Sequence, residues 1–466
     1  MLKVHNTLGR TLETFKPLKD NLVKIYHCGP TVYWTQHIGN MRGMTVGDLI
    51  RRSVIYLGYQ VKYVRNYTDF GHLTSDADTG EDKIEKAAHK EKTTPKQIAD
   101  KYIQQFEDDT AQLNILEPNV KTRATDYLEE MIVMVKALLD KGFAYSTPAA
   151  IYFDISKFPK YTELSGQDLS ENITGAGTGN IQDKNKKKPA DFALWFFRSG
   201  PHKNALQYWP SPFFSSEVEK GYGFPGWHIE CSAMISKVLG KTIDMHIGGV
   251  EHIPIHHTNE IAQSESTNGV KFVNYWLHNE HLVVNNEKMS KSAGTGLVLA
   301  DITTKGFQPM DLRYFFLQAH YRGKQNFNWE SLAAAKSSLK RLVNFAKTWN
   351  QEKKEQKGKV IKDLQAEFQK KLEDDFNIPQ ALALVWELTK YQADPADKLV
   401  TLLDFDRVLG LKIGEQMQRK AQIPAGAQKL LTERESARKS RDFARADAIR
   451  KELERKYQIK LSDKAL

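Results

Sequence analysis

The stretch YHCGPTVYWTQHIGN, residues 26–40, gives the clearest indication of how this chain folds. The segment before it, NLVKIYHC, is typical of a strand that ends at Cys28, and the segment after it, MRGMTVGDLIRRSVIYLGY, spaces its apolar residues as a helix does. A second strand, QVKYVRNYTD, ends near Thr68 and Asp69. This succession of strand, helix and strand predicts parallel strands, with ligands gathered at their carboxyl ends.

The turn HIGN, which opens the predicted helix and ends at Asn40, is suited to binding phosphate. Free backbone N–H groups and the helix dipole favour anionic oxygens at such a position. His37 can donate a hydrogen bond to phosphate, and Gly39 lets the backbone approach closely. The turn has no GxGxxG pattern, so dinucleotide binding is not indicated. Four residues alone are a weak signal.

A second motif, KMSKS, spans residues 288–292 and precedes the glycine-containing run AGTG. Lys288 and Lys291 lie at i and i+3 between small residues, a pattern that suits a mobile loop closing over a triphosphate. Their ammonium groups would stabilise the negative charge that builds on a departing pyrophosphate. A random pair of surface lysines is the alternative, but the full pentapeptide is far more specific.

The bulk properties describe a large basic chain of 466 residues with a formal net charge of +10. This length predicts roughly two to four domains, and the charge fits a polyanionic partner such as nucleic acid. The start MLKVHNTLGRTLETF lacks the apolar run of a secretory signal, and no stretch approaches ~18 uninterrupted apolar residues. We therefore expect a cytoplasmic protein without membrane contact, in which Cys28 and Cys231 form no disulfide.

Beyond the first α/β units the sequence changes character twice. Residues 145–219 contain short strand patterns, glycine-rich turns and the basic run KNKKKP, which indicates an insertion between two halves of a sheet. The α/β pattern resumes at GWHIECSAMISKVLG, and after about residue 323 the chain becomes almost entirely helical and highly charged. Its final segment, ESARKSRDFARADAIRKELERKYQIKLSDK, indicates a basic amphipathic helix followed by a short strand.

HIGN followed far along the chain by KMSKS resembles the paired nucleotide signatures of class I aminoacyl-tRNA synthetases. Further blocks narrow the resemblance to the cysteinyl-tRNA synthetase family: CGPTVY before HIGN, VRNYTD at 64–69, PGWHIECSAM at 225–234, HHTNEIAQSE at 256–265 and DLRYFFLQAHYRG at 311–323. The likeness covers essentially the whole chain, including the terminal RDFARADAIRKEL.

The resemblance implies an α/β fold in which a class I Rossmann-type catalytic domain carries a connective insertion. An α-helical bundle and a small C-terminal domain that binds the tRNA anticodon would follow. The expected ranges are 1–117 and 220–271 for the two halves of the catalytic domain, 118–219 for the insertion, 272–333 for the stem-contact region with the KMSKS loop, 334–405 for the bundle and 406–466 for the anticodon-binding region.

The resemblance also implies one zinc ion per chain at the floor of the amino-acid pocket. Its ligands in the family match Cys28, Cys231, His256 and Glu260 here. Thiolates and imidazole are donors that zinc prefers, and a helix places residues i and i+4, such as His256 and Glu260, on one face. The adjacent His257 is an i, i+3 alternative to His256. Both cysteines of the chain are used in this arrangement.

The implied reaction is the activation of L-cysteine by ATP, bound with Mg²⁺, and the transfer of cysteine to tRNA(Cys) by a monomeric enzyme. The residues that match ATP-binding positions are His37, Gly39, Asn40, Lys288 and Lys291, of which His37, Lys288 and Lys291 are the expected catalytic residues. The residues that match the pocket for the substrate cysteine are Gly29, Thr68 and Trp227. Zinc in this pocket would distinguish the substrate thiol from the hydroxyl of serine.

Three positions depart from the family pattern. Asn40 stands where the nucleotide motif usually ends in His, so this position can donate a hydrogen bond but cannot transfer a proton. Ile247 replaces a glycine in HIGGVEHIPIHHTNE, which puts a close backbone approach there in doubt. The segment FGHLTSDADTGEDK, residues 70–83, is longer than in short members, and the sequence assigns it no role.

Two other functions are compatible with parts of this pattern. A ligase that joins cysteine to an amino sugar in thiol biosynthesis would share the nucleotide and zinc sites, but it would not need the basic C-terminal segment. A non-catalytic tRNA-binding paralogue would not need an intact KMSKS and all four metal positions. We therefore keep the amino-sugar ligase as the main alternative.

Overall fold

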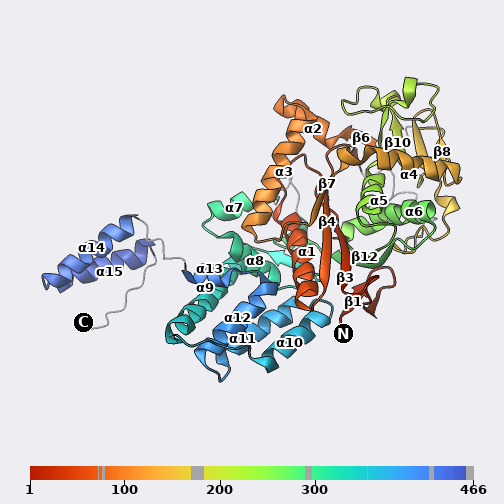
Figure 1. Cartoon of the computed structure of the whole chain (residues 1–466). Coiled ribbons are helices and arrows are strands. Elements are labelled where there is room, and N and C mark those ends of the chain that lie inside the picture. Colours follow the sequence, from red (N-terminus) through yellow and green to blue (C-terminus); the bar gives the residue numbers. More distant parts are fainter. Residues whose placement is uncertain are drawn as a thin grey trace. The chain divides into compact units, whose positions relative to one another are not determined.

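A computed structural model describes residues 1–71, 73–75, 79–168, 183–288, 296–353, 355–418 and 425–457, and it divides the chain into two compact units, residues 1–413 and 414–466 (Figure 1). The centre of the first unit is a parallel five-stranded sheet in the order β13-β12-β3-β4-β7. Its strands are β3 (Leu22–His27), β4 (Gln60–Tyr67), β7 (Val120–Arg123), β12 (Ile243–Gly249) and β13 (Val273–Asn279).

The strand order indicates where on this sheet a ligand is expected to bind. From β3 the chain runs outward through β4 and β7, whereas β12 and β13 are added on the other side of β3. The boundary between β3 and β12 is therefore the switch point at which open α/β sheets bind their ligands. All seven residues of β12 are buried, as expected for a parallel strand covered on both faces.

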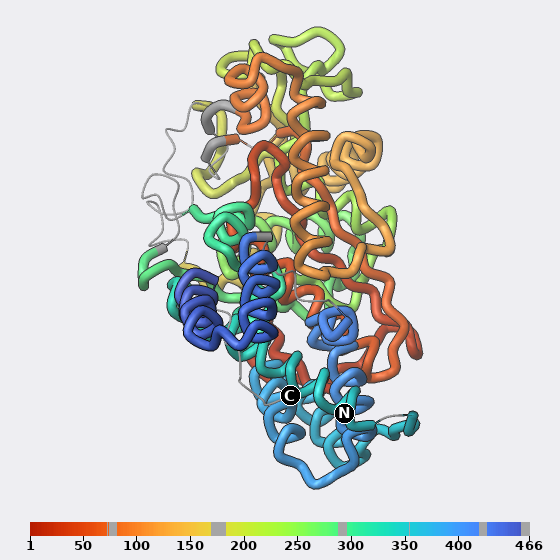
Figure 2. Tube along the Cα trace, turned by 90° about the vertical axis from the view of Figure 1, so that its left-hand side faces the viewer, coloured from red at the N-terminus to blue at the C-terminus, as the bar shows by residue number. Residues whose placement is uncertain are grey.

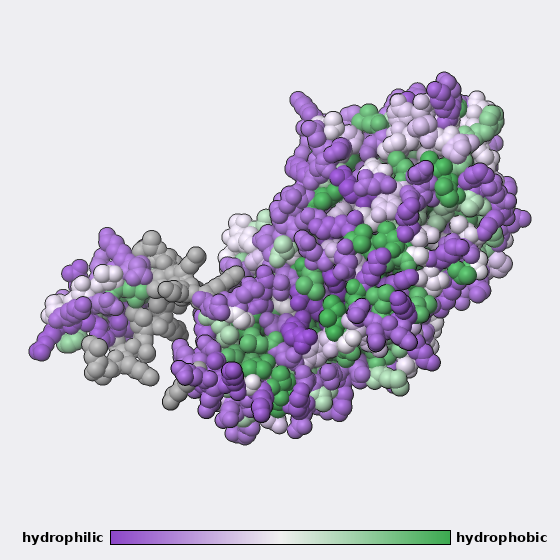
Figure 3. Space-filling model, in the orientation of Figure 1, coloured by the Kyte–Doolittle hydropathy of each residue, from purple (hydrophilic) through white to green (hydrophobic). Residues whose placement is uncertain are grey.

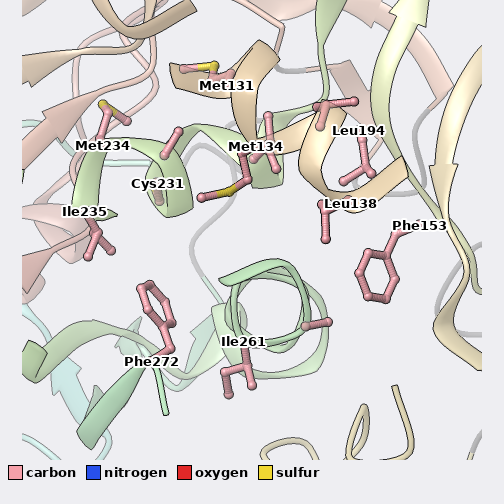
Figure 4. Packing of buried hydrophobic residues seen from close by; sticks show 14 of the residues in the cluster. Met131, Met134, Leu138, Phe153, Leu194, Cys231, Met234, Ile235, Ile261 and Phe272 are labelled. Carbon is pink, nitrogen blue, oxygen red and sulfur yellow. The ribbon is translucent and has the colours of Figure 1, made fainter. Parts of the chain in front are cut away.

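Helices cover both faces of the parallel sheet. They are α1 (Ile38–Tyr56), α3 (Pro95–Gln112), α4 (Leu128–Asp140), α5 (Trp227–Val238) and α6 (Thr258–Asn268), while α2 (Lys83–Glu91) packs on α3. α1 connects β3 to β4, as the sequence predicts, and lies so close to the sheet that a Cβ atom on Gly47 would be 2.4 Å from His27 Nδ1. On the opposite side of the sheet, α4, α5 and α6 contribute Met134, Cys231 and Ile261 to one hydrophobic core (Figure 4).

The segment between β7 and α5 forms an antiparallel four-stranded sheet in the order β11-β10-β9-β8. Its strands are β8 (Ala144–Ser146), β9 (Ala150–Phe153), β10 (Phe192–Phe197) and β11 (Gly223–Pro225). A two-stranded hairpin, β5 (Leu73–Ser75) and β6 (Thr79–Asp82), occupies part of the longer loop noted in the sequence. A further hairpin at the N-terminus pairs β1 (Lys3–Asn6) with β2 (Thr11–Thr14).

The side chain of His202 should lower the stability of the protein in acid. Its ring contacts Phe196 and Phe224 at centroid distances of 4.7 Å and 5.3 Å, and burial lowers its pKa to about 4. As the pH falls, this histidine takes up a proton in the unfolded chain, at a pKa of about 6.5, before it does so in the folded protein. The free energy of unfolding therefore decreases as the pH drops below about 6.5. Urea unfolding of His202→Phe should depend less on pH than that of the wild type, by up to about 2 kcal/mol between pH 7 and pH 5. Parallel profiles for the two proteins would contradict the assignment.

The helical bundle and the antiparallel sheet lie at opposite ends of the first unit, with the parallel sheet between them (Figures 1 and 2). The bundle consists of α9 (Trp329–Glu352), α10 (Lys362–Glu373), α11 (Ile378–Lys390) and α12 (Pro395–Leu409). The connecting region contains β14 (Leu282–Val284), β15 (Glu287–Lys288), α7 (Leu299–Thr304), α8 (Pro309–Leu317) and β16 (Gln325–Phe327). Short helical turns are η1 (Ala124–Tyr127), η2 (Ile155–Lys157), η3 (Gly200–His202), η4 (Glu219–Gly221), η5 (Val250–His252) and the π-type η6 (Ile253–His257).

A buried ion pair joins α1, which packs on the parallel sheet, to the region around the bundle. Asp48 of α1 and Arg313 of α8 are fully buried, with Arg313 Nη2 2.6 Å from Asp48 Oδ2. Arg52 Nε also donates to Asp48 Oδ2, at 2.8 Å. Arg313 further donates from Nε to the carbonyl of Leu409 at the end of α12, at 2.8 Å. One carboxylate thereby holds α1, α8 and α12 together.

The second unit consists mainly of two helices, α14 (Ala425–Lys439) and α15 (Phe443–Tyr457), with Ala427, Ile449 and Leu453 packed between them. α13 (Ile413–Gln418) spans the boundary between the units. The sequence predicts one basic helix from residue 435 onward, but the structure divides it: residues 435–439 end α14, and α15 begins after a turn in which Arg441 has a φ of +62°. The strand predicted after this helix lies outside the described residues. The face of the first unit seen in Figure 3 is mainly hydrophilic. Within the described part of the chain, we find no helix with both the length and the apolar composition that a membrane crossing requires.

Candidate active site

A cleft of about 440 Å³ opens at the switch point of the parallel sheet. Residues from both halves of the sheet line it, together with the start of α1. The predicted site residues among its lining are Cys28, Gly29, His37, Gly39, Asn40, Thr68, Trp227, Cys231 and His256. The structure therefore brings the predicted nucleotide turn, the predicted cysteine pocket and three predicted metal ligands to one cavity.

The four predicted metal ligands lie together at the floor of this cleft. Cys28 follows β3, Cys231 lies in α5, His256 lies within the π-type turn η6, and Glu260 lies in the first turn of α6. All four are buried, and their ligand atoms lie within 4.8 Å of one another. His256 Nε2 is 2.8 Å from Glu260 Oε1, which in turn is 3.9 Å from Cys28 Sγ.

This donor set fits a zinc ion. Two thiols, one imidazole and one carboxylate are ligands that zinc binds in proteins. A second set, Cys28, His246, His257 and Glu260, also has its ligand atoms within 4.8 Å. The first set offers both cysteines, whereas the second offers one, and soft thiolate ligands are the stronger zinc donors. We therefore favour the first set.

A layer of buried side chains orients the favoured ligands. His246 Nε2 lies 2.9 Å from Glu260 Oε2 and so fixes the carboxylate. His228 Nδ1 forms a 2.9 Å hydrogen bond with His256 Nδ1, which leaves His256 Nε2 for a metal. The Trp227 ring stacks on the His256 ring at 4.5 Å with an angle of 22° between the planes. Such outer contacts set the direction and basicity of metal ligands.

The predicted metal ligands shift one another's pKa values. Burial raises the pKa of the Cys28 thiol well above its usual value, and the neighbouring Cys231 adds to the effect. A hydrogen bond from Cys28 lowers the pKa of Cys231 to about 6. Burial alone would lower the pKa of His256, but the Glu260 carboxylate outweighs it and raises this pKa to about 10. Metal binding to these groups would therefore release protons.

The nucleotide turn has a defined hydrogen-bond direction. His37 precedes α1 as its N-cap, and its Nδ1 accepts a 3.1 Å hydrogen bond from the backbone N–H of Asn40. Because Nδ1 accepts, the proton of the neutral ring lies on Nε2, which can donate to a phosphate oxygen. Gly39 and Asn40, in the first turn of α1, also line the cleft. The N-terminus of α1 and the His37 ring thus have the geometry and polarity that suit an anion.

The cysteine-pocket residues sit in a tightly built corner. Gly29 N–H donates to Asn66 Oδ1 at 2.8 Å, and a Cβ atom on Gly29 would lie 1.7 Å from the Asn66 carbonyl oxygen, so only glycine fits there. The Thr68 hydroxyl donates to Glu230 Oε2 at 2.9 Å. Asn66 and Glu230 were not among the predicted site residues, although they stand within the VRNYTD and PGWHIECSAM blocks. Burial, followed by the nearby Cys231, raises the pKa of Glu230 well above its usual value.

The departures from the family pattern have different consequences. Ile247 is buried in the core on the far side of the sheet, and the cleft is lined instead by Gly248 and Gly249. The doubt about backbone approach at Ile247 therefore does not concern the cleft. Lys288 ends β15, but its side chain and residues 289–295, including Lys291, lie outside the described residues.

Comparisons with known proteins identify the family. The family described as tRNA synthetases class I (C) catalytic domain matches residues 14–337. A cysteine–tRNA ligase of Treponema denticola is 41% identical, over 97% of this chain and 96% of its own. Cysteine–tRNA ligase 1 of Burkholderia lata is 40% identical over 97% of this chain and 93% of its own, and that of Thermus thermophilus is 37% identical over 97% and 95%.

Solved structures support the fold. Methionyl-tRNA synthetase of Mycobacterium tuberculosis, in complex with methionyl-adenylate, aligns over 85% of this chain and 91% of its own with a TM-score of 0.57 and 14% identity. The LeuRS of Agrobacterium radiobacter, in a ternary complex with tRNA and LeuAMS, aligns over 87% of each chain with a TM-score of 0.61 and 11% identity. The class I fold is thereby confirmed, and the near full-length relatives place this chain in the cysteinyl-tRNA synthetase family.

Proposed function

We propose that this chain activates L-cysteine with ATP and transfers it to tRNA(Cys), with a zinc ion selecting the substrate thiol. The observation that carries the proposal is the position of the Cys28, Cys231, His256 and Glu260 cluster in the same cleft as the N-terminus of α1. One cavity thus offers a thiol-selective floor and a phosphate-binding edge. The relatives named cysteine–tRNA ligase support this reaction, and they give no support to the amino-sugar ligase.

In the first step the carboxylate of cysteine attacks the α-phosphate of ATP, and pyrophosphate leaves. The attacking group belongs to the substrate, so the protein has to supply position and charge compensation rather than a nucleophile. His37, through Nε2–H, and the first turn of α1 with Gly39 and Asn40 would hold the phosphates. We assign Lys288 and Lys291 to the leaving pyrophosphate, and Mg²⁺ to the bound ATP, on the resemblance of the KMSKS motif.

The zinc ligands determine which amino acid is accepted. When bound by Cys28, Cys231, His256 and Glu260, zinc would supply a soft Lewis acid that prefers the thiolate of cysteine to the hydroxyl of serine. Shape alone discriminates poorly between two amino acids that differ by one atom of similar size. Trp227, stacked on His256, would cover the substrate side chain.

The second step needs the tRNA to reach this cleft with its terminal adenosine. We assign residues 118–219 to contact with the acceptor end and residues 406–466 to the anticodon. Basic residues are abundant on α14 and α15 of the second unit: Lys429, Arg434, Arg438, Lys439, Arg445, Arg450, Lys451, Arg455 and Lys456. Phosphate contacts of this kind make tRNA binding weaken steeply with salt. We propose that the enzyme acts as a cytoplasmic monomer.

The experiment that tests the function is ATP-dependent attachment of labelled cysteine to total tRNA, with labelled serine as the control. Acid-precipitable product with cysteine but not with serine is the expected result. Cysteine-dependent pyrophosphate exchange without any charged tRNA would instead support the amino-sugar ligase. Exchange that proceeds equally well with serine would contradict the selective role of the metal.

His37 gives a prediction about the activation step. In His37→Ala the donor to phosphate and the N-cap of α1 are both lost, so cysteine-dependent pyrophosphate exchange should fall about 100- to 1000-fold. The cap itself is worth only about 1 kcal/mol, so the protein should still fold. His37→Asn keeps a cap and a donor and should lose less. Equal exchange rates for His37→Ala and the wild type would remove His37 from the proposed mechanism.

A further inference from the structure

A buried glutamate side chain lies directly behind the proposed cysteine pocket. Glu230 lies in α5 between the helix start and Cys231, and its side chain is inaccessible to solvent. Its Oε2 accepts the Thr68 hydroxyl at 2.9 Å, whereas its Oε1 has no hydrogen-bond partner among the described residues. A buried polar atom left unsatisfied costs stability, and an apolar side chain of the same size would avoid that cost. A contribution to binding would explain why the carboxylate is retained.

Thr68 connects this carboxylate to the cleft. Thr68 lines the cleft, while Glu230 does not. The Thr68 hydroxyl hydrogen points at Glu230, and the Thr68 oxygen accepts a 3.3 Å hydrogen bond from Asn66 Nδ2. A hydroxyl has one hydrogen and two acceptor positions, so one acceptor position of Thr68 remains. With its hydrogen committed to Glu230, Thr68 can offer the cleft only an acceptor.

We propose that Glu230 is a positioning residue that holds the Thr68 oxygen ready to accept a hydrogen bond from the α-ammonium group of the substrate amino acid. This inference rests on the proposed function, because it takes L-cysteine as the substrate. The ammonium group has three donors and no acceptor, so it matches a hydroxyl whose hydrogen is already used. Without Glu230 the hydroxyl is able to rotate and present its own hydrogen to the ammonium group, which weakens binding.

Two fragments of cysteine separate this role from the role of the metal. Cysteamine keeps the ammonium and thiol groups, whereas 3-mercaptopropionate keeps the carboxylate and thiol groups. Their inhibition constants are measured against L-cysteine in pyrophosphate exchange, with zinc content determined for each protein. Glu230→Leu should weaken the binding of cysteine and of cysteamine about 10- to 100-fold, as expected for a hydrogen bond to a charged group. The same variant should change the inhibition constant of 3-mercaptopropionate less than about twofold, because that fragment makes no such bond.

Further variants guard against a simple folding defect. Thr68→Val should lower the affinity for cysteamine as much as Glu230→Leu does. The double variant should lose no more affinity than either single variant, because both changes act through one hydrogen bond. Glu230→Gln keeps an oxygen that can accept from Thr68 and should restore cysteamine binding to within about threefold of the wild type. Glu265→Gln, on the neighbouring helix α6, removes a carboxylate that accepts from Phe272 N–H and serves as the matched control.

The outcomes distinguish this inference from the proposed function. Equal weakening of both fragments in Glu230→Leu and in Thr68→Val would mean a structural role and would overturn the inference. No weakening of cysteamine in Thr68→Val would overturn it as well, even if Glu230→Leu fails to fold. A wild-type protein without cysteine-dependent exchange would instead contradict the proposed function.

Discussion

The Cys231→Ser variant should not retain zinc. Its rate of cysteine-dependent pyrophosphate exchange should be lower than that of the wild type by a factor of about 100 or more. Changes to residues that merely orient a metal ligand already cost about 10- to 100-fold, and loss of a ligand should cost more. Cys231 lies in α5 with its side chain buried, and its thiol is one of four ligand atoms within 4.8 Å of one another. A serine hydroxyl at this position is a poor ligand for zinc, because it does not ionise near neutral pH.

This experiment also separates the two metal-ligand sets. The second set, Cys28, His246, His257 and Glu260, does not contain Cys231. Full zinc content and activity in Cys231→Ser would therefore favour that set and contradict the one proposed here. Met234→Leu is the matched control, because Met234 lies in the same helix and the same hydrophobic core but offers no ligand to zinc. It should keep its zinc, as measured by elemental analysis of the purified protein.

Asp48→Asn should destabilise the first unit by about 3–5 kcal/mol, the range found when one partner of a buried ion pair is removed. The change leaves the Arg313 guanidinium buried with no counter-charge at 2.6 Å, and it also weakens the bond from Arg52. The Asp48 carboxylate holds its charge, because the Arg313 and Arg52 guanidiniums keep its pKa below the usual value despite the opposing effect of burial. The measurement is urea unfolding at pH 7, followed by circular dichroism.

A second ion pair on the same unit provides the control for Asp48. Lys136 and Asp140 pair at i and i+4 on α4, with side chains 59% and 62% exposed. Asp140→Asn should therefore change the free energy of unfolding by less than about 1 kcal/mol, as is usual for a surface pair. If Asp48→Asn cost no more than Asp140→Asn, the buried pair would not be what connects α1 to α8 and α12.

Much of the fold could be predicted from short-range patterns. The segments around YHCGPTVYWTQHIGN alternate between strand and helix spacing, and the structure has β3, α1 and β4 in that order. The class I fold expected from HIGN and KMSKS is confirmed by the matching family and by the solved structures. The grouping of Cys28, Cys231, His256 and Glu260 was expected from the family blocks, and the structure brings these residues together, while their role as zinc ligands remains our proposal.

Other features depend on contacts between distant segments and have no local signal. The bond between His246 and Glu260 and the contact between His228 and His256 arise only when β12, α5, η6 and α6 come together. Glu230 is one of many acidic residues in the sequence, and only its burial behind Thr68 sets it apart. The consequence of Ile247 also required the structure, because the side of a strand that faces the core is fixed by the register of the sheet.

The most direct test of zinc as the cysteine-selecting element is X-ray absorption spectroscopy at the zinc edge of the purified protein. Without substrate, the spectrum should show two sulfur neighbours, from Cys28 and Cys231, with the remaining ligands being nitrogen and oxygen. Addition of L-cysteine should add a third sulfur neighbour, whereas addition of L-serine should leave the spectrum unchanged. A sulfur count that does not change with L-cysteine would contradict the account.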